Sequence, residues 1–477
     1  MSNFVLTLKL DVNPYQEDIL DTRLEIGRQI YNACLNELYK RYRLMTESKE
    51  YCSAMKLPKT DKKKNKLLKK LNITYGLTEY SLHNFVAPMQ KHFKKNIDSF
   101  TAQKLASRVF SAFEGVLYHT AKKAHFKKYG EMNSLEGKSK ETGIRFLNNT
   151  LVWNNLSIPV IIRKKDDYAQ LALENDLKYC RVVRKGDTYY LQLILEGIPP
   201  QKLNKDGSSR HKIGTSTVGI DIGTQTIAIC SDKEVKLLEL APEINHTNRE
   251  IRRLQRKMDR SRRANNPTKY NPDGTINRSN RDPWIKSNHY QSLQKKLATM
   301  QSKYQAIRKQ SHNRLVNYII SLGTEIYVEE MNYKGLQKRS KKTEKNANGK
   351  FKEKKRFGKS LANKAPSAFL TMLDNRLKYL GEELVKINTA KTKASQYNHI
   401  TNSFAKKDLG ERWNIVDDHK VQRDLYSSFL IMNINPNLES VNREKCLKTY
   451  NNFLDLHDIE INQLRTSSNN KLSSMGM

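Results

Sequence analysis

Three carboxylates at the edges of predicted core elements constrain this chain more than any other feature. Asp221 interrupts a β-branched apolar run that ends in a glycine turn, Glu329 closes a second such run, and Asp424 opens an apolar segment with helical spacing. A carboxylate at the edge of a core costs free energy unless it is solvated, paired or bound to a metal ion. One such residue alone is usually a solvated strand end. Three of them on a strongly basic chain predict a Mg²⁺ site that faces a polyanion.

The charge balance indicates the kind of partner. The chain carries 86 Lys and Arg residues against 49 Asp and Glu, a formal net charge of +37. A compact chain with this charge repels itself, so we expect a nucleic acid as its partner. A cationic membrane-binding protein is the alternative, but no apolar run is long enough to cross a bilayer and the first residues lack the pattern of a signal peptide. We therefore expect a cytoplasmic protein.

The cysteines argue against a disulfide framework and against a zinc ribbon. Their number is odd, they are far apart, and none forms a Cys-x-x-Cys pair, which is typical of reduced cytosolic thiols. They are Cys34, Cys52, Cys180, Cys230 and Cys446.

The first two hundred residues combine a helical region with short strands. Residues 3–11 alternate like a strand, and helical spacing follows Pro14 and returns at 78–128. The lysine-rich stretch 57–72 is weakly patterned, so we expect a solvated loop or the end of a helix. Between 144 and 197 the pattern changes to short strands. A small β-barrel that includes residues 3–11 would explain why the first strand stands alone.

A Pro- and Gly-containing linker at 198–214 precedes a second pattern. Two hairpin strands follow, then long helices over 244–263 and 287–322, the strand that Glu329 closes, and a last helix and strand. Antiparallel strands followed by crossover units predict the mixed α/β sheet of a ribonuclease-H-like domain. In such a sheet, neighbouring strand ends bring distant acidic residues together.

This acidic set suits phosphodiester hydrolysis. A two-metal site needs carboxylates that hold ions roughly 3.5–4 Å apart, and Mg²⁺ prefers a few carboxylates completed by water and phosphate. Asp221, Glu329 and Asp424 supply that set, with Asp221 as the expected bridging ligand. Residues 219–225 also look like the first phosphate motif of sugar kinases, but a kinase needs a later glycine-rich loop. The chain contains no Gly-Gly dipeptide, and a kinase has no use for so much positive charge.

Three strings carry a family resemblance. The strings VGIDIG at 218–223, VEEMN at 328–332 followed by Lys334-Gly335, and RDLYSS at 423–428 resemble, in order and spacing, the three RuvC motifs of the TnpB (OrfB) family. These are transposon-encoded proteins related to type V CRISPR effectors. The resemblance covers nearly the whole chain and is strongest after residue 215.

The resemblance implies an RNA-guided DNA endonuclease with a RuvC-like nuclease domain, a wedge β-barrel and a helical recognition domain. It implies Asp221, Glu329 and Asp424 as catalytic acids and metal ligands for two Mg²⁺ ions, with Glu330 at a usually acidic position. It also implies a guide RNA encoded by the transposon, a double-stranded and single-stranded DNA target, and a prokaryotic, nucleoid-associated protein.

The same resemblance sets the expected domain boundaries. We expect the first part of the wedge barrel and the start of the helical region at 1–50, the recognition domain at 51–135, and the rest of the wedge barrel at 136–200. A linker is expected at 201–216, before the RuvC-like domain at 217–435, which has a degenerate zinc-ribbon position at about 391–422. A C-terminal helix and tail are expected at 436–477.

The chain departs from the family pattern in two places. Most relatives carry a four-cysteine zinc ribbon between the second and third motifs, where this chain has no cysteine, and His399 and His419 cannot replace four thiolates. We therefore expect no zinc, and packing around Tyr397, Phe404 and Trp413 in its place. The usual Asn-Ala-Ala of the third motif is Tyr-Ser-Ser at 426–428, which still permits close approach of a helix to a sheet.

Two alternatives to a nuclease stay open. Some relatives are nuclease-inactive, RNA-guided DNA-binding repressors, which are marked by loss of the acids; all three are present here, which favours cleavage. A DNA transposase with the same fold would act on defined DNA ends without a guide. Copurifying RNA separates the transposase from the other two, and a Mg²⁺-dependent product separates the nuclease from the repressor.

Two basic segments are candidate nucleic-acid surfaces. Arginines at three- and four-residue spacing would line one face of a helix, which suits phosphate contacts, whereas a balanced ion-pair surface would need more acids. The run 338–359 holds eleven Lys and Arg residues and is expected either to order on nucleic acid, as a lid over the site, or to be a disordered loop. The candidate residues are Arg249, Arg252, Arg253, Arg256, Arg260, Arg263, Lys354, Lys355 and Arg356.

Overall fold

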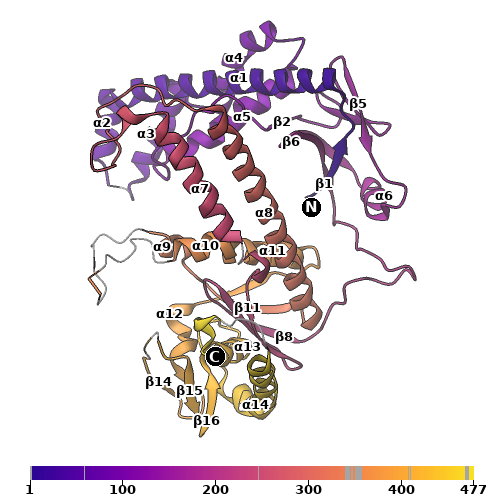
Figure 1. Cartoon of the computed structure of the whole chain (residues 1–477), viewed down its shortest axis with the longest axis vertical. Helices are drawn as coiled ribbons and strands as arrows, with labels where there is room; N and C mark the ends of the chain where they lie inside the picture. The colour runs from indigo at the N-terminus through magenta and orange to yellow at the C-terminus, as the bar shows by residue number, and fades with distance from the viewer. Residues whose placement is uncertain are drawn as a thin grey trace. The chain divides into compact units, whose positions relative to one another are not determined.

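The chain divides into two compact units, Met1–Lys202 and Leu203–Met477, whose elements are labelled in Figure 1. The computed structural model describes residues 3–58, 60–244, 247–338, 344, 348–349, 357–406, 408, 410–467 and 472–477. Within these residues, no helix is both long enough and apolar enough to cross a membrane.

The first unit is built on an antiparallel sheet of seven strands in the order β2-β6-β7-β1-β5-β4-β3. Its central strand, β1 (Asn3–Leu10), buries every second side chain, as its alternating sequence predicts, and pairs with β7 on one side and β5 on the other. We expected a small β-barrel; because β2 and β3 end this order without pairing with each other, the sheet forms a half-barrel. The other strands are β2 (Ser134–Glu136), β3 (Arg145–Leu147), β4 (Thr150–Trp153), β5 (Leu156–Ile161), β6 (Leu177–Lys185) and β7 (Thr188–Glu196).

The helices of this unit lie between β1 and β2 in the chain, apart from one short helix. The longest, α1 (Pro14–Thr46), begins at a capping box in which Asn13 and Gln16 bond to each other's backbone N–H, and its apolar stripe packs against α5. The others are α2 (Lys49–Lys56), α3 (Lys62–Thr74), α4 (Glu79–His92), α5 (Ser99–Leu117) and α6 (Asp167–Leu173).

The lysine-rich stretch 57–72, which we expected to be a loop or a helix end, instead contains most of helix α3. Asp61 caps the first turn, and Leu71 is buried. The ammonium of Lys64 bonds to the carbonyl oxygens of Met55 and Leu57 while its stem is buried. A lysine that buries its stem in this way adds to the apolar face without being apolar in sequence, and the sequence pattern therefore missed the helix.

The second unit contains a mixed sheet of five strands in the order β10-β9-β8-β11-β12. The strands β8 (Thr217–Ile222), β9 (Thr226–Cys230) and β10 (Val235–Glu239) form an antiparallel meander, while β11 (Glu325–Glu329) and β12 (Leu384–Ile387) run parallel to β8. This is the order of hairpin and crossover strands that the sequence predicts.

Helices cover both faces of this sheet. On one face, Val218, Ile220 and Ile222 of β8 pack in a core with α8 and α11; on the other, β9 and β10 contribute to a core with α13 and α14. The helices are α7 (Thr247–Ala264), α8 (Asn288–Leu322), α9 (Tyr333–Leu336), α10 (Gly358–Lys364), α11 (Pro366–Lys378), α12 (Thr389–Thr392), α13 (Arg423–Met432) and α14 (Arg443–Thr466).

The segment at the zinc-ribbon position folds as two small hairpins, β13 (Tyr397–Asn398) with β14 (Ser403–Phe404) and β15 (Trp413–Val416) with β16 (His419–Gln422). The Tyr397 ring is buried, and the indole N–H of Trp413 donates to the carbonyl of Gly476. Phe404 contacts the Tyr397 ring but is exposed, so the prediction that it packs in a core was wrong.

Candidate functional site

The side-chain alternation of two neighbouring strands places Asp221 and Glu329 together. Val218, Ile220 and Ile222 point into the α8 and α11 core, so Asp221 points to the opposite face, toward α13. Ile326 and Val328 of β11 point into the same core, which puts Glu329 on the face of Asp221. The parallel pairing matches Val328 with Ile220, and the next residues along the two strands are Glu329 and Asp221. The two carboxylates therefore lie side by side at one end of the sheet.

The first turn of α13 brings in the third carboxylate, Asp424. The helix begins where the Gln422 side chain accepts from the N–H of Leu425, and the N–H of Gln422 itself donates to Nε2 of buried His457. These bonds fix the start of the helix. The dipole of α13 also favours a negative charge at Asp424, because the helix N-terminus carries partial positive charge.

The electrostatics show that the three acids share one small region. The pKa of Asp221 is raised well above its usual range, first by burial and then by the negative charges of Asp424 and Glu329. Burial also raises the pKa of Glu329 to about 7. The structure thus brings together the three acidic residues that the sequence singled out, and among the described residues burial and mutual repulsion outweigh the positive charge of Arg423 at Asp221.

Arg423 places a positive charge beside Asp424. Its Nε lies 3.3 Å from Oδ1 of Asp424, and one of its terminal nitrogens donates to the carbonyl of Glu411 at 3.0 Å. Its charge also lowers the pKa of Asp221, although less than burial and the neighbouring acids raise it. Arg423 therefore compensates part of the charge and restrains the direction in which Asp424 points.

Two hydroxyl groups beside Asp221 were not identified from the sequence. Ser427 is buried and lowers the pKa of Asp221, yet among the described residues its Oγ has no partner at hydrogen-bond geometry. Tyr333 is buried too, and its hydroxyl has no hydrogen-bond partner in the described part of the chain. The pKa of Tyr333 is raised by burial and by the charge of Asp221. The signal was available: Ser427 lies one helical turn after Asp424, and Tyr333 follows the strand that Glu329 closes.

The donor chemistry of the site fits Mg²⁺. Within the part of the chain that the structure describes, no three His, Cys, Asp or Glu side chains are already arranged to hold a metal ion. Carboxylate oxygens are the protein ligands that Mg²⁺ prefers, with water and phosphate completing the shell. A cation would relieve the repulsion that raises the pKa of Asp221, and its water ligands would supply partners for the buried hydroxyls of Ser427 and Tyr333.

Tyr426, the first residue of the Tyr-Ser-Ser string at 426–428, has a structural role in the packing of α13. Tyr426 lies two residues after Asp424, on a different face of α13, and its hydroxyl bonds to His399, with 2.7 Å to Nδ1 and 3.2 Å to the backbone nitrogen. The His399 ring also contacts Phe429 and Tyr450. Burial lowers the pKa of His399 to about 4, so the ring is neutral at physiological pH. An aromatic cluster around a neutral histidine therefore holds the hairpin segment to α13.

The predicted arginine surface on α7 is present. The six arginines are exposed and fall within an arc of about 100° at 3.6 residues per turn, away from buried Leu254, and α7 packs beside α8 (Figure 1). Asp259 pairs with Arg262 and Arg263 at 2.6 and 2.9 Å. The remaining candidates, Lys354, Lys355 and Arg356, lie outside the described residues.

Comparison with known proteins adds little to this picture. No family model and no curated protein matches the chain. Similar solved structures include the crystal structure of the Cas12i1 R-loop complex after target DNA cleavage, with a TM-score of 0.28, and a cryo-EM structure of a Cas12i–crRNA–dsDNA complex, with a TM-score of 0.26. Each is 9% identical to this chain; the alignments cover 94% and 93% of this chain and 64% of the Cas12i chain in both cases.

The chain therefore spans less than two thirds of the length of these two Cas12i proteins, which belong to the type V CRISPR effectors. At such TM-scores the likeness does not bear on activity. The resemblance to TnpB stays an interpretation of the three motifs.

Proposed function

We propose that this protein is an RNA-guided DNA endonuclease of transposon origin, related to the TnpB family that its motifs resemble, and that it cuts target DNA by two-metal-ion hydrolysis. The observation that carries the proposal is the convergence of Asp221, Glu329 and Asp424, three acids separated by long insertions, on one end of one sheet. A sheet order of β10-β9-β8-β11-β12, with a meander followed by parallel strands, supports a ribonuclease-H-like RuvC domain for the second unit.

The residues of the site have separate roles in this proposal. Asp221, Glu329 and Asp424 would hold two Mg²⁺ ions, which when bound activate a water molecule and stabilise the leaving oxygen. The charges of both other acids raise the pKa of Asp221, and we therefore propose that Asp221 would be the ligand shared by the two ions. Arg423 directs Asp424 and presents a fixed positive charge to a phosphate. The hydroxyls of Ser427 and Tyr333 orient the groups around Asp221.

The nucleic-acid partners follow from charge and from the motif resemblance. The net charge of +37 and the arginine row of α7 support binding along a phosphate backbone. In this proposal the row contacts a guide–target heteroduplex through its backbone, while base pairing supplies the sequence specificity. The partners are then a guide RNA encoded by the transposon and a DNA target that is double-stranded before strand separation and single-stranded after it.

The test begins with purification of the full chain from cells that also carry its native flanking DNA. Sequencing of the bound RNA should give one abundant species with a variable end, and that end defines a DNA target. Wild-type protein should cut this DNA only with Mg²⁺, and Asp221→Ala should abolish cutting while target binding stays. Asp232→Ala is the matched control, because Asp232 is an exposed aspartate in the turn between β9 and β10.

A specific observation favours a second candidate, a nuclease-inactive RNA-guided repressor. Asp424, one of the three acids, is already paired with Arg423. Among the described residues, no three His, Cys, Asp or Glu side chains are arranged to hold a metal ion. The repressor would bind the same guide and target but give no Mg²⁺-dependent product. A guide-independent transposase, the third candidate, would copurify with random RNA fragments and join DNA ends without a guide.

A further inference from the structure

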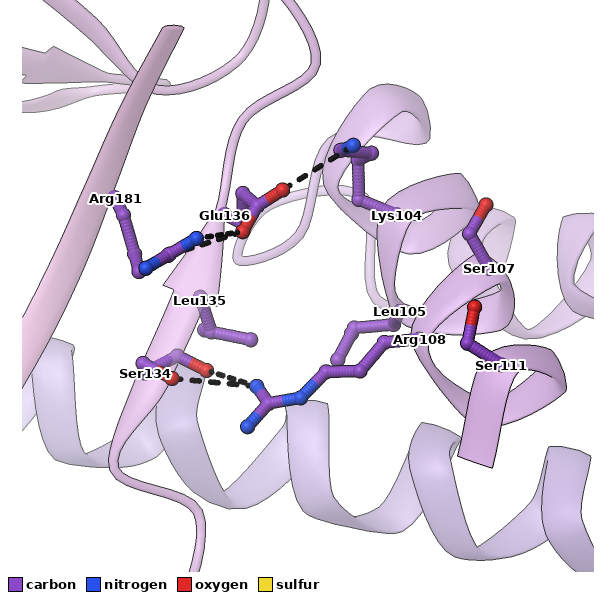
Figure 2. A pocket seen from close by; sticks show the side chains of 9 residues that line it. All are labelled: Lys104, Leu105, Ser107, Arg108, Ser111, Ser134, Leu135, Glu136 and Arg181. Carbon is purple, nitrogen blue, oxygen red and sulfur yellow. Dashed lines mark hydrogen bonds and ion pairs between the residues drawn. The ribbon is translucent and has the colours of Figure 1, made fainter. Parts of the chain in front are cut away.

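A basic pocket in the first unit lies outside the carboxylate site and has no role so far. Its volume is about 470 Å³, within the range of about 300–1,000 Å³ that is usual for ligand sites. It opens where α5 meets β2 and β6 (Figure 2). Its polar lining includes Lys104, Arg108, Ser111, Ser134, Glu136 and Arg181.

The charges in this pocket are not balanced. Figure 2 shows Lys104 and Arg181 converging from opposite sides on Glu136, at 3.2 Å and 2.6 Å from its two carboxylate oxygens. A single carboxylate thus serves two cations. Arg108 is a third cation, and no carboxylate lies within ion-pair distance of it in the described part of the chain.

Neutral groups hold Arg108 in place. One of its terminal nitrogens donates to the carbonyl oxygen and to the hydroxyl of Ser134, at 3.1 and 3.2 Å. Its positive charge also reaches Lys127, whose pKa is lowered first by burial and then by Arg108. The positive charge of a guanidinium that bonds only to neutral acceptors, with further cations nearby, is not compensated and can pair with an anionic ligand.

We propose that this pocket binds the phosphate backbone of a nucleic-acid strand, with Arg108 as the primary contact and with Lys104 and Arg181 exchanging Glu136 for phosphate oxygens. The identification of the ligand as a nucleic acid rests on the proposed function; the anion chemistry rests on the pocket itself. Phosphate suits the site because a guanidinium presents paired N–H donors that match its oxygens, and because Ser111 of α5 and Ser134 of β2 add hydroxyl groups to the lining. In this arrangement Glu136 acts as an internal competitor of the ligand.

This competition gives two substitutions with opposite expected effects. Arg108→Gln removes a contact and should weaken binding, and it should reduce the slope of log affinity against log salt by about 0.7, the value per phosphate contact on a single strand. Glu136→Gln keeps the shape of the side chain but releases Lys104 and Arg181, so it should tighten binding and steepen the slope. Lys178→Gln is the control: it removes one positive charge from the same strand as Arg181, at an exposed residue that pairs with Glu196.

The experiment measures fluorescence anisotropy of a short labelled single-stranded RNA with the full chain, across a salt series and with a metal chelator present. Thermal unfolding of each variant checks that it is folded. The opposite effects of Arg108→Gln and Glu136→Gln cannot both come from partial unfolding, so a loss of stability in one variant does not remove the test.

Two results would overturn the pocket assignment while leaving the proposed function intact. In the first, wild-type protein binds the RNA and both pocket variants behave like Lys178→Gln. In the second, inorganic phosphate raises the unfolding temperature of the wild type but not that of Arg108→Gln, while both bind RNA equally well. That result would assign the pocket to free phosphate. A wild-type chain that fails to bind any RNA would instead contradict the proposed function.

Discussion

The backbone of Gly219 in β8 lies directly against the backbone of Ser428 in α13. A Cβ atom added to Gly219 would lie 2.1 Å from the carbonyl oxygen of Ser428 and 2.3 Å from the amide nitrogen of Met432, which are distances that no side chain can occupy. The strand and the helix can approach this closely only because Gly219 has no side chain. Since Asp221 follows on the same face of β8 and Asp424 precedes on the same helix, this contact brings the two carboxylates together.

Replacement of Gly219 by Ala should therefore separate the strand from the helix. We expect the free energy of unfolding to fall by about 1–3 kcal/mol, as for other overpacked cores. We also expect the cleavage rate to fall by more than the fraction of unfolded protein accounts for. Gly410→Ala is the control, because nothing lies within 4 Å of a Cβ at Gly410. Urea unfolding and a cleavage assay on both variants check this; equal behaviour of the two would contradict the packing argument.

The stability of the metal-free protein should fall as pH rises. Burial raises the pKa of Glu329 from 4.5 to about 7, so between these values the folded chain binds more protons than the unfolded chain, and the free energy of unfolding decreases with rising pH. The raised pKa of Asp221 acts in the same direction. Added Mg²⁺ should reverse the trend, because it favours the ionised carboxylates.

Replacement of Glu329 by Gln should flatten this pH dependence, since a neutral amide does not titrate. Glu383 is exposed and directly precedes β12, so Glu383→Gln is the control and should leave the pH dependence as in the wild type. Urea unfolding in a chelating buffer at about pH 5 and about pH 8 makes the comparison across the titration window. A wild-type stability that increases over this window would show that the Glu329 carboxyl is not held in its protonated form.

Tyr333→Phe should separate stability from activity. The substitution removes a buried hydroxyl that has no hydrogen-bond partner among the described residues. An unsatisfied buried group costs about 1–3 kcal/mol, so the variant should be as stable as the wild type or more stable. If the hydroxyl orients groups around Asp221, cleavage should nevertheless decrease. Tyr304→Phe, which removes an exposed hydroxyl that donates to Glu250, is the control for both measurements. Unchanged cleavage by Tyr333→Phe would remove Tyr333 from the site.

Tyr426→Phe tests the aromatic cluster around His399. The change leaves both the backbone N–H and Nδ1 of His399 without a partner in a buried environment, at a cost of about 1–3 kcal/mol. Tyr397→Phe removes a less buried bond, to Asn402, and should cost less. Thermal unfolding compares the two. If Tyr426→Phe is no less stable than Tyr397→Phe, the His399 bond does not hold the hairpin segment to α13.

The sequence predicted the second unit well because its strands obey a simple rule. Alternation of Val218, Ile220 and Ile222 places Asp221 on the opposite face, and the same rule places Glu329. The convergence of the acids could therefore be predicted before the structure was known, whereas their catalytic role stays a prediction.

What the sequence did not indicate depends on contacts between distant residues. The burial of the Lys64 stem, the partnership of His399 with Tyr426 and the approach of Tyr333 to Asp221 each join residues whose spacing carries no periodic signal. The failure of the first sheet to close has the same origin, because strand alternation indicates which face is buried and not how far a sheet curves.

Cleavage by the reprogrammed complex tests the central claim most directly. The variable end of the copurified RNA is replaced by a sequence that matches a chosen DNA, and cutting of that DNA is measured with Mg²⁺, with a chelator, and with the Asp221→Ala variant. We expect the wild type to cut the matching DNA with Mg²⁺ only, and the variant to bind this DNA without cutting it. Cutting that ignores the RNA sequence, or that survives the loss of Asp221, would contradict it.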